Sequence, residues 1–592
     1  MKNTISILCT GLLIILLYSC QEDEIFEDLE KESTNIKVDQ LGEKLENPFS
    51  VVNMRKALDS LKVKNEQYRD KDFEVETTHL YLRFKPKDEQ ELNILEADST
   101  LVLYSFPLDR EIPESLTSYH DSSIPKNKPT FQYCAVPVTY DFPHDIKVKI
   151  LEELYLPEED QRTAARSSGN LLYDLEKEAF AITGNEFDKV KSGKNNTAAR
   201  NASFTPSGRI RVWDDVIGST TTTTRTFSHW EYYDCGDGDI PLAIGSVDTD
   251  LEESRGFGSM VKPIEPIELP GECKRAVYTY HSTNTPGSYI PIEGVKVRAR
   301  RWFTTKSDLT DSNGDFNITH SFGGDVNYLI VWEHAFWDIR DGNLTQAYYN
   351  GPQKSNPWNL NIGGGKSLRF ATIHRACHRY TFEDVDNLSR PILGGGSKLK
   401  INYNDGEGTG VNWGVEWQNV DFGTGLLPNI KIWRSSENLE RDWFTNEIFS
   451  TTIHELAHTT HIQEMNWGTI DYGQVRPILY ESWADAVEWY LTRKEYIERG
   501  EADYDDPTVR GFRNALADNK QWWNFNDSHE YTPIFIDLID DYNQATQFEP
   551  TLPVDNSKPN ENITGYWMQT IEDVVLKDAY GLTSLRSELK RT

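Results

Sequence analysis

The chain contains the segment His454-Glu455-Leu456-Ala457-His458, which lies inside a long helical pattern over residues 446–465. Two histidines four residues apart project from the same side of a helix, so their imidazoles can share one metal ion. Glu455 is carried around the helix to where its carboxylate can reach a metal-bound water. With 13 histidines in 592 residues, about 0.02 such HExxH matches are expected by chance. We therefore expect a catalytic zinc site with His454 and His458 as ligands and Glu455 as the general base.

A catalytic zinc ion usually has three protein ligands and one open position, so a third ligand is needed. Glu481 and Asp485 stand four residues apart in the next helical pattern, over residues 479–497, and therefore share one face of it. We expect Glu481 to bind the metal and Asp485 to hydrogen-bond a ligating histidine. The alternatives are His461, for which the helix would have to distort, and Glu464, which would need a chain turn that no glycine provides.

The HExxH segment together with Glu481-Ser482-Trp483-Ala484-Asp485 resembles the HExxH…ExxxD pattern of the thermolysin-like gluzincins, which are zinc metallopeptidases. The resemblance implies a zincin-like α+β catalytic domain in which His454, His458 and Glu481 hold Zn²⁺. It also implies a hydrolase that cleaves peptide bonds of extracellular proteins or glycoproteins with a metal-activated water. Gluzincins stabilise the oxyanion with a Tyr or His, for which four candidates stay open: Tyr472, His529, Tyr531 and Tyr566. The last hundred residues match no pattern of the family.

Two other interpretations stay open beside this one. The first is an enhancin-like, mucin-directed peptidase, in which HExxH is followed by a more distant Glu. The second is a non-catalytic surface lipoprotein that binds glycan or protein. The chain contains neither a G-x-S-x-G elbow nor a phosphate-binding loop, which disfavours serine hydrolases and nucleotide enzymes.

A second histidine pair, His374 and His378, also has a spacing of four residues. No Glu follows His374, and no third ligand accompanies the pair. We therefore expect both residues to have a structural role in a helix over residues 367–380.

The composition limits the partners of the protein. The formal net charge is −33, and a chain this acidic repels phosphate backbones and anionic lipid. We therefore expect a protein or peptide substrate, no nucleic acid, and no membrane contact except through a lipid anchor. The aromatic content of 12% indicates folded domains with large cores.

The first 20 residues are typical of a targeting segment, with Lys2 before an apolar stretch over residues 5–17. Leu17-Tyr18-Ser19-Cys20 resembles the lipobox of bacterial lipoproteins, which implies that Cys20 carries a lipid anchor such as palmitate. The acidic residues after Cys20 resemble surface-export signals of Bacteroidetes-type lipoproteins. We expect an extracytoplasmic, lipid-anchored protein of the outer membrane, which faces either the periplasm or the cell surface.

Cysteine positions predict one disulfide. Cys235 and Cys273 bracket a loop-rich segment, so we expect them to pair in an oxidising compartment. The alternative is that these two, Cys134 and Cys377 are all free, buried thiols.

An all-β module is predicted upstream of the metal motifs. Residues 208–213 and 294–300 alternate apolar and polar side chains, and Asn313-Gly314 is typical of a tight hairpin turn. The order of seven residues resembles carboxypeptidase-regulatory-like β-sandwich modules: Gly294, Val295, Val297, Thr310, Asp311, Gly314 and Phe316. The acidic turn lacks the Gly and distal Glu of an EF-hand loop, which disfavours calcium.

The chain is too long for one core, and we expect a multidomain α+β protein. The region over residues 48–165 has a β-α-β pattern, namely a helix at 50–62, a strand at 77–84, a helix at 89–97 and a strand at 101–104. The catalytic region has a strand at 398–403 and an edge strand at 429–433, which would bind an extended peptide by β-augmentation. The expected division is a signal peptide at 1–20, a tether at 21–47, an N-terminal α/β accessory domain at 48–165, a linker at 166–206 with one helix at 171–182, a β-sandwich at 207–340 with an insertion at 230–280, and a zinc metallopeptidase domain at 341–592.

Overall fold

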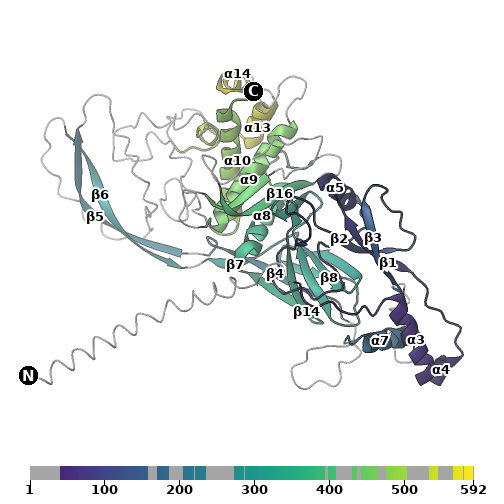
Figure 1. The fold of residues 1–592 in the computed structure, drawn as a ribbon. Helices are drawn as coiled ribbons and strands as arrows, with labels where there is room; N and C mark the ends of the chain where they lie inside the picture. The colour runs from purple at the N-terminus through teal and green to yellow at the C-terminus, as the bar shows by residue number, and fades with distance from the viewer. Residues whose placement is uncertain are drawn as a thin grey trace, which may run out of the picture.

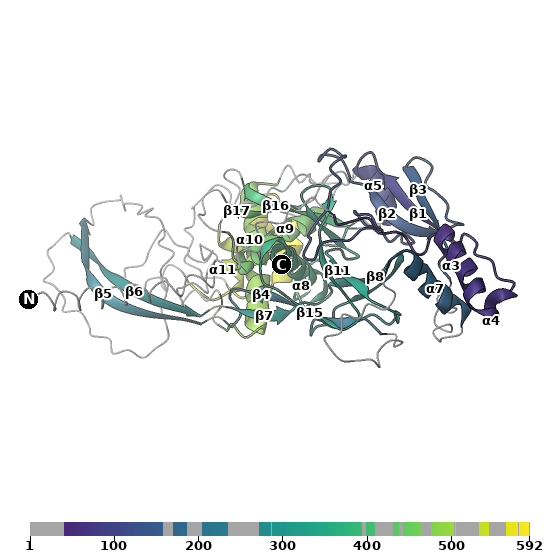
Figure 2. The same cartoon turned by 60° about the horizontal axis from the view of Figure 1, so that its bottom comes forward.

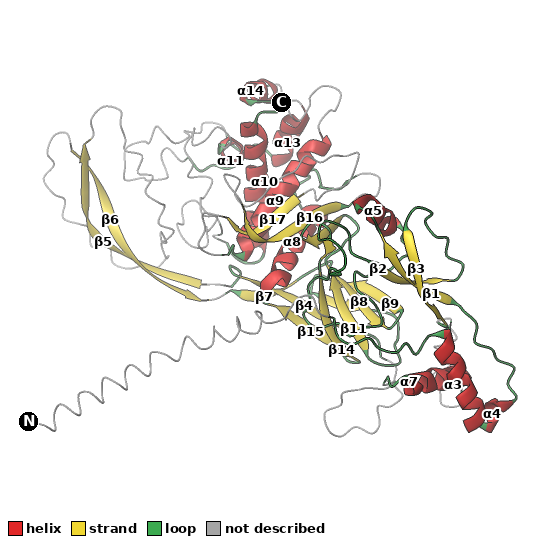
Figure 3. Cartoon of the chain, viewed as in Figure 1, coloured by secondary structure: helices red, strands yellow, loops and turns green. Residues whose placement is uncertain are grey.

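The computed structural model is a mixed α+β protein with several separate sheets (Figures 1 and 3). It describes residues 41–157, 170–185, 204–218, 220–234, 272–285, 287–393, 398–408, 430–436, 442–464, 475–502, 504, 532–543, 564–577 and 579–590. The signal peptide and Cys20 lie outside these residues. No helix within the described ranges combines the length and apolar character needed to span a bilayer.

The N-terminal region is built on a three-stranded antiparallel sheet of order β2-β1-β3. Its elements are α3 (Val51–Lys64), α4 (Glu66–Arg69), β1 (His79–Lys85), α5 (Glu89–Ala97), β2 (Gln132–Pro137) and β3 (Lys147–Leu154). The Ser50 hydroxyl accepts the Asn53 N–H at 3.1 Å and so caps α3. The predicted helices and the strand at 77–84 are confirmed.

The predicted strand at 101–104 is wrong. Only Tyr104 pairs there, in an isolated bridge to Tyr133. Leu101 and Leu103 pack against the core from an irregular segment, so their apolar character reflects burial and not strand pairing. Because β1 pairs antiparallel on both sides, the region is α+β, and the expected α/β architecture is also wrong.

Helix α7 (Leu171–Ile182) matches the predicted helix, although it was expected within a linker. It packs on α3, where Phe180 contacts Phe49 with ring centroids 5.6 Å apart. The Tyr68 hydroxyl donates to Asp174 at 2.5 Å. This part of the expected linker therefore belongs to the N-terminal core.

Two four-stranded sheets follow, which we call the paired sheets, and their buried side chains meet in one core. The first has the order β10-β4-β15 with β7 also on β4, and the second has the order β14-β11-β8-β9. Their strands are β4 (Ser207–Asp214), β7 (Ser288–Pro291), β8 (Lys296–Arg301), β9 (Thr304–Leu309), β10 (Asp315–Asn317), β11 (Val326–Val331), β14 (Tyr348–Lys354) and β15 (Trp358–Ile362). Phe316 of β10 and Tyr328 of β11 join the two sheets, with ring centroids 6.0 Å apart.

The Asn313-Gly314 turn is present, and Gly314 has a φ of +75° that favours glycine. It is not a hairpin turn, however, because β9 pairs with β8 whereas β10 pairs with β4. The turn therefore carries the chain from one paired sheet to the other. The carboxylate of Asp311 accepts the N–H groups of Asn313 and Asp315 at 2.8 and 2.9 Å, a turn-forming role that needs no calcium.

A long antiparallel ribbon of β5 (Thr220–Asp234) and β6 (Glu272–Thr285) leaves the first paired sheet between β4 and β7. It extends away from the other described elements in both views (Figures 1 and 2). Cys235 lies outside the described residues, so the predicted disulfide with Cys273 is not tested. Cys134 and Cys377 are free and buried.

A fourth sheet, which we call the parallel sheet, has the order β13-β12-β16-β17. Its strands are β12 (Trp337–Asp341), β13 (Thr345–Gln346), β16 (Leu399–Gly408) and β17 (Ile430–Ser436). Strands β12, β16 and β17 run parallel, and β17 ends the order, as predicted for an edge strand.

The expected boundary between residues 340 and 341 does not separate two folding units. Strand β12 begins before it yet belongs to the parallel sheet, whereas β14 and β15 follow it yet complete the paired sheets. The chain therefore passes back and forth between the sheets. The expected boundary rested on the change from strand to helix patterns, which does not reveal which sheet a strand joins.

The helical layer contains α8 (Gly365–Phe382), α9 (Thr445–Glu464), α10 (Pro477–Glu498), α11 (Ile534–Ile539), α13 (Met568–Lys577) and α14 (Leu582–Leu589). Helix α9 packs between α8 and α10 (Figure 2). Apolar side chains on one face of the parallel sheet, such as Ile339 and Tyr403, share a core with these helices. The opposite face carries Arg340, which is fully buried and pairs with Glu89 of α5 at 3.1 Å. Both faces of the sheet are therefore covered.

Buried ion pairs join the paired sheets to the helical layer. Asp214 of β4 binds Arg375 of α8 at 2.7 Å and accepts the Tyr496 hydroxyl of α10 at 2.9 Å. Arg375 also binds Glu495 of α10 at 3.2 Å. Removing one partner of such a group would leave a charge buried without compensation. The ion pairs therefore fix α8 and α10 relative to β4.

Candidate metal centre

Helix α9 carries the HExxH segment in its middle, and its first turn is held by a residue from the paired sheets. Oδ2 of Asp215 accepts the Thr445 N–H at 2.8 Å, and the Thr445 hydroxyl accepts the Asp215 N–H at 2.8 Å. The Glu447 carboxylate accepts the Phe444 N–H at 2.6 Å. These bonds satisfy donors that the start of a helix leaves without intrahelical partners. The position of α9 is therefore set by the loop that follows β4.

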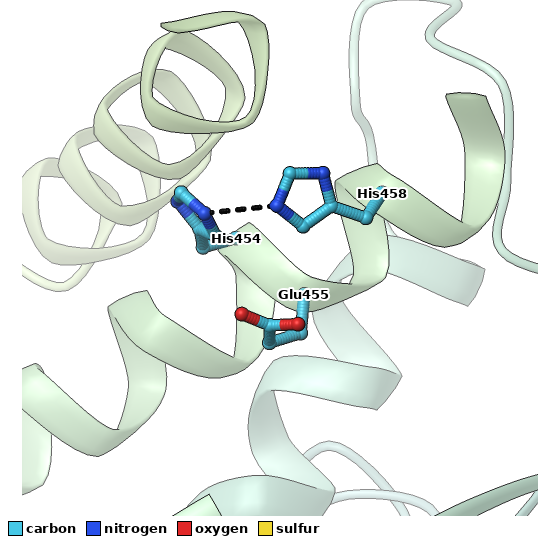
Figure 4. Close-up of side chains that lie close together, drawn as sticks. All are labelled: His454, Glu455 and His458. Atoms are coloured by element: carbon cyan, nitrogen blue, oxygen red, sulfur yellow. Dashed lines mark hydrogen bonds between the residues drawn. The ribbon is translucent and has the colours of Figure 1, made fainter. Parts of the chain in front are cut away.

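The two histidines of α9 converge as their spacing predicts. Nε2 of His454 and Nε2 of His458 lie 3.1 Å apart, and the two rings meet edge to face (Figure 4). Glu455 projects from the same turn, beside the two imidazoles in the same view. His458 is buried, and His454 is nearly so.

Glu481 reaches the same point from α10. Its Oε2 atom lies 3.2 Å from Nε2 of His454 and 3.4 Å from Nε2 of His458. Nitrogen and oxygen ligands about 2.0–2.1 Å from a tetrahedral zinc ion lie roughly 3.3–3.4 Å from one another. The three donor atoms therefore form a triangle of the size that one such ion requires.

The other candidate ligands fit less well. An oxygen of Glu455 also lies within 4.8 Å of the two histidine ligand atoms, whereas Oε2 of Glu481 lies 3.2 and 3.4 Å from the two Nε2 atoms. Glu464 is exposed at the end of α9. His461 is buried, and burial together with His458 lowers its pKa to about 3.

The other ring nitrogen of His454 faces two carboxylates of α10. Nδ1 lies 3.0 Å from Oδ1 of Asp485 and 3.2 Å from Oε2 of Glu488. A carboxylate there holds the proton on Nδ1 and leaves Nε2 free to bind a metal. Sequence reasoning identified Asp485 but missed Glu488. Glu488 follows Glu481 by seven residues and so lies on the same helix face, but this spacing alone does not show that it reaches His454.

The carboxylates change the protonation of the site. Burial alone would lower the pKa of His454, but hydrogen bonds with Asp485, Glu481 and Glu488 outweigh it and raise the pKa well above the usual value. Burial would raise the pKa of Glu481, but the charges of His458 and His454 hold it far below the usual value. The pocket therefore favours a cation between Glu481 and the histidines, either a proton or a metal ion.

Glu455 has the environment of a general base. Its side chain is buried, and its Oε2 atom has no hydrogen-bond partner among the described residues. Burial raises its pKa above the usual value, and the nearby histidines only partly offset this. A raised pKa makes a carboxylate a better proton acceptor near neutral pH.

The second histidine pair has its own contacts. Nε2 of His374 lies 2.9 Å from the carbonyl oxygen of Glu293, and Nδ1 of His378 lies 3.3 Å from Oε1 of Glu383. Burial, and to a lesser extent His378, lower the pKa of His374 to about 3, which keeps it neutral. The pair therefore links α8 to the paired sheets and is not part of a described group of ligand atoms.

Three of the four oxyanion candidates, Tyr472, His529 and Tyr531, lie outside the described residues. Tyr566 is described; its side chain packs partly buried against the core, and its N–H donates to the Leu538 carbonyl at 2.8 Å. The described residues therefore do not identify the oxyanion donor.

Comparison with known proteins adds no relative. No protein-family model matches the chain, and neither a curated protein nor a solved structure matches it. What the site can do must therefore be inferred from its own residues and distances.

Proposed function

We propose that this protein is a zinc-dependent peptidase of the gluzincin type. The observation that carries the proposal is the triangle of His454 Nε2, His458 Nε2 and Glu481 Oε2, with edges of 3.1, 3.2 and 3.4 Å and Glu455 beside it. Two imidazoles and one carboxylate form a ligand set typical of catalytic zinc, and three ligands leave the fourth position open.

In this proposal each residue has one task. A zinc ion held by the three ligands would lower the pKa of a bound water to about 7 and polarise a carbonyl group. Glu455 would serve as the general base that takes a proton from the attacking water and gives it to the leaving amine. Asp485 and Glu488 keep the proton of His454 on Nδ1, so that Nε2 presents its lone pair.

The proposal also assigns roles to the sheets, to strand β17 and to Cys20. The paired sheets correspond to the carboxypeptidase-regulatory-like module, and the parallel sheet with α8, α9 and α10 corresponds to a zincin-like domain. Strand β17 would hold an extended substrate peptide along its edge. A lipid anchor on Cys20 would hold the enzyme outside the cytoplasm, where extracellular proteins or glycoproteins are its substrates.

Metal analysis tests the proposal directly. The purified protein should contain about one zinc ion per chain and should cleave members of a broad peptide library. A chelator should stop cleavage, and added zinc should restore it. A protein that contains no zinc after purification and takes up none would contradict the proposal.

Asp485→Asn and Glu488→Gln should each weaken zinc binding by roughly 10–100-fold, as loss of a carboxylate behind a ligating histidine commonly does. The measurement is the zinc Kd from competition with a chromophoric chelator at fixed pH. Glu498→Gln is a matched control, because Glu498 lies on the same helix but pairs with Arg379. Wild-type affinity in both variants would remove these residues from the positioning of His454.

A further inference from the structure

The outer surface of the first paired sheet carries a shallow, open depression of about 580 Å³, on a different part of the molecule from the metal centre. Its lining includes side chains from three strands: Arg209, Arg211, Asp315, Asn359 and Asn361. Alternate residues of β4, Ile210 and Val212, are fully buried in the core beneath. The strand therefore presents an apolar side to the core and a planar polar side to the solvent.

Strand register arranges these side chains in rows. Asp315, Arg209 and Asn359 are direct partners across β10, β4 and β15. Two residues along β4, Arg211 pairs with Asn361. Neighbouring strands lie about 4.7–4.9 Å apart, so each row offers neighbouring polar groups.

The polar side chains of the depression differ in how they are held: one pair is fixed by hydrogen bonds, and the other side chains are exposed. Nε and Nη2 of Arg209 donate to the two oxygens of Asp315 at 2.6 and 2.7 Å, so this pair forms a fixed plane. Arg211, Asn359 and Asn361 are exposed. Each Asn amide can both donate and accept, and a guanidinium donates in a fixed fork. Neighbouring planar groups of this kind suit ligands that present adjacent hydroxyl groups.

An aromatic pair continues the surface at the end of β4. Trp213 and Tyr289 are direct partners across β4 and β7, and their ring centroids lie 5.2 Å apart. Tyr289 keeps 38% of its surface exposed. Trp213 is partly buried against the core, and its Nε1 donates to Asp215 at 2.8 Å, so Tyr289 offers the more accessible ring. A sugar ring has hydroxyl groups at its edges and C–H groups on its faces, so polar rows beside an aromatic surface match both parts of it.

Other occupants fit less well. A nucleic acid would be repelled by the net charge of −33. An extended peptide needs the free edge of a sheet for its backbone hydrogen bonds, whereas this surface is a sheet face. An apolar partner would have to desolvate the Asn and Arg side chains without replacing their hydrogen bonds.

We propose that this face is a carbohydrate-binding site, with Arg211, Asn359 and Asn361 as the hydrogen-bonding residues and Trp213 with Tyr289 as the aromatic surface. The site acts independently of the metal centre. It would hold the protein on a glycan while the metal centre acts on a neighbouring part of the same material.

A glycan microarray with neutral, sialylated and sulfated oligosaccharides tests the proposal. The protein used is the chain from residue 48, where the tether ends, to residue 592. The protein should bind a subset of these glycans, and titration calorimetry with the best-bound oligosaccharide should then give a Kd. The double variant N359A/N361A should weaken this binding at least tenfold. Both residues are exposed, so the thermal melting temperature should stay within about a degree.

The matched control is Gln353→Ala, which removes an exposed amide from β14 of the other paired sheet and should leave the Kd unchanged. Two results would overturn the proposal: no binding to any glycan on the array, or equal affinity of N359A/N361A and the wild type. Neither result depends on zinc content or peptide hydrolysis, so failure here and failure of the peptidase proposal can be told apart.

Discussion

Glu455→Gln is expected to reduce kcat/KM for peptide hydrolysis by about 10²–10⁴-fold, the range that a general base contributes. Glutamine has nearly the same shape but cannot accept the proton of a metal-bound water. Because Oε2 of Glu481, at 3.2 and 3.4 Å from the two histidine Nε2 atoms, is assigned as the third donor, the zinc content should stay at about one ion per chain. The measurement combines steady-state kinetics on a fluorogenic peptide with elemental analysis of the same preparation.

The control is Glu464→Gln, which makes the same chemical change at the exposed end of the same helix. It should leave both hydrolysis and zinc content near wild type. Hydrolysis by the Glu455 variant at the wild-type rate would remove Glu455 from the role of general base. Loss of zinc from that variant would instead make Glu455 a ligand, the alternative that its distance to the histidines leaves geometrically open.

Glu481→Ala should have the largest effect on the metal. It removes one of three donors and leaves two imidazoles whose Nε2 atoms lie 3.1 Å apart. The zinc Kd should rise by more than the roughly 100-fold that loss of a supporting carboxylate causes, and hydrolysis should fall with it. Competition with a chromophoric chelator measures the Kd.

A parallel His461→Asn variant distinguishes the two ligand assignments. If Glu481 is the ligand, zinc affinity should collapse in Glu481→Ala and change little in His461→Asn. The reverse pattern would contradict the assignment. His461 is buried, so circular dichroism of both variants should accompany the metal measurement to detect loss of fold.

Individual helices could be predicted from the sequence because their patterns involve only residues that are close together along the chain. Helices α5 and α7 have the predicted bounds, and α9 and α10 differ from the predicted bounds by one or two residues. HExxH and ExxxD also placed four site residues on two helix faces, since spacing along one helix determines direction. The convergence of the two helices at 3.2 and 3.4 Å could not be derived in this way, because it depends on packing.

Pairing between distant segments could not be predicted. The Asn313-Gly314 turn has the hairpin sequence, yet the strands on its two sides join different sheets. Leu101 and Leu103 have the apolar character of a strand, yet they pack partly buried against the core without a ladder partner. Glu488 was missed for a different reason: in a chain with 94 acidic residues, one more carboxylate on a helix carries little information until its distance to His454 is known.

The crossing of the chain between the paired sheets and the parallel sheet limits how this protein can be rebuilt. A cut between β12 and β14 would separate β14 and β15 from the other strands of the paired sheets. It would also separate β12 from β16 and β17 of the parallel sheet. The same cut would part Asp215 from the helix start that it holds, over 230 positions of sequence. A chimaera that transplants the HExxH helix into another scaffold must therefore carry the sequence from β4 to α10 as one cassette. Shorter grafts would leave buried strands and charges without their partners.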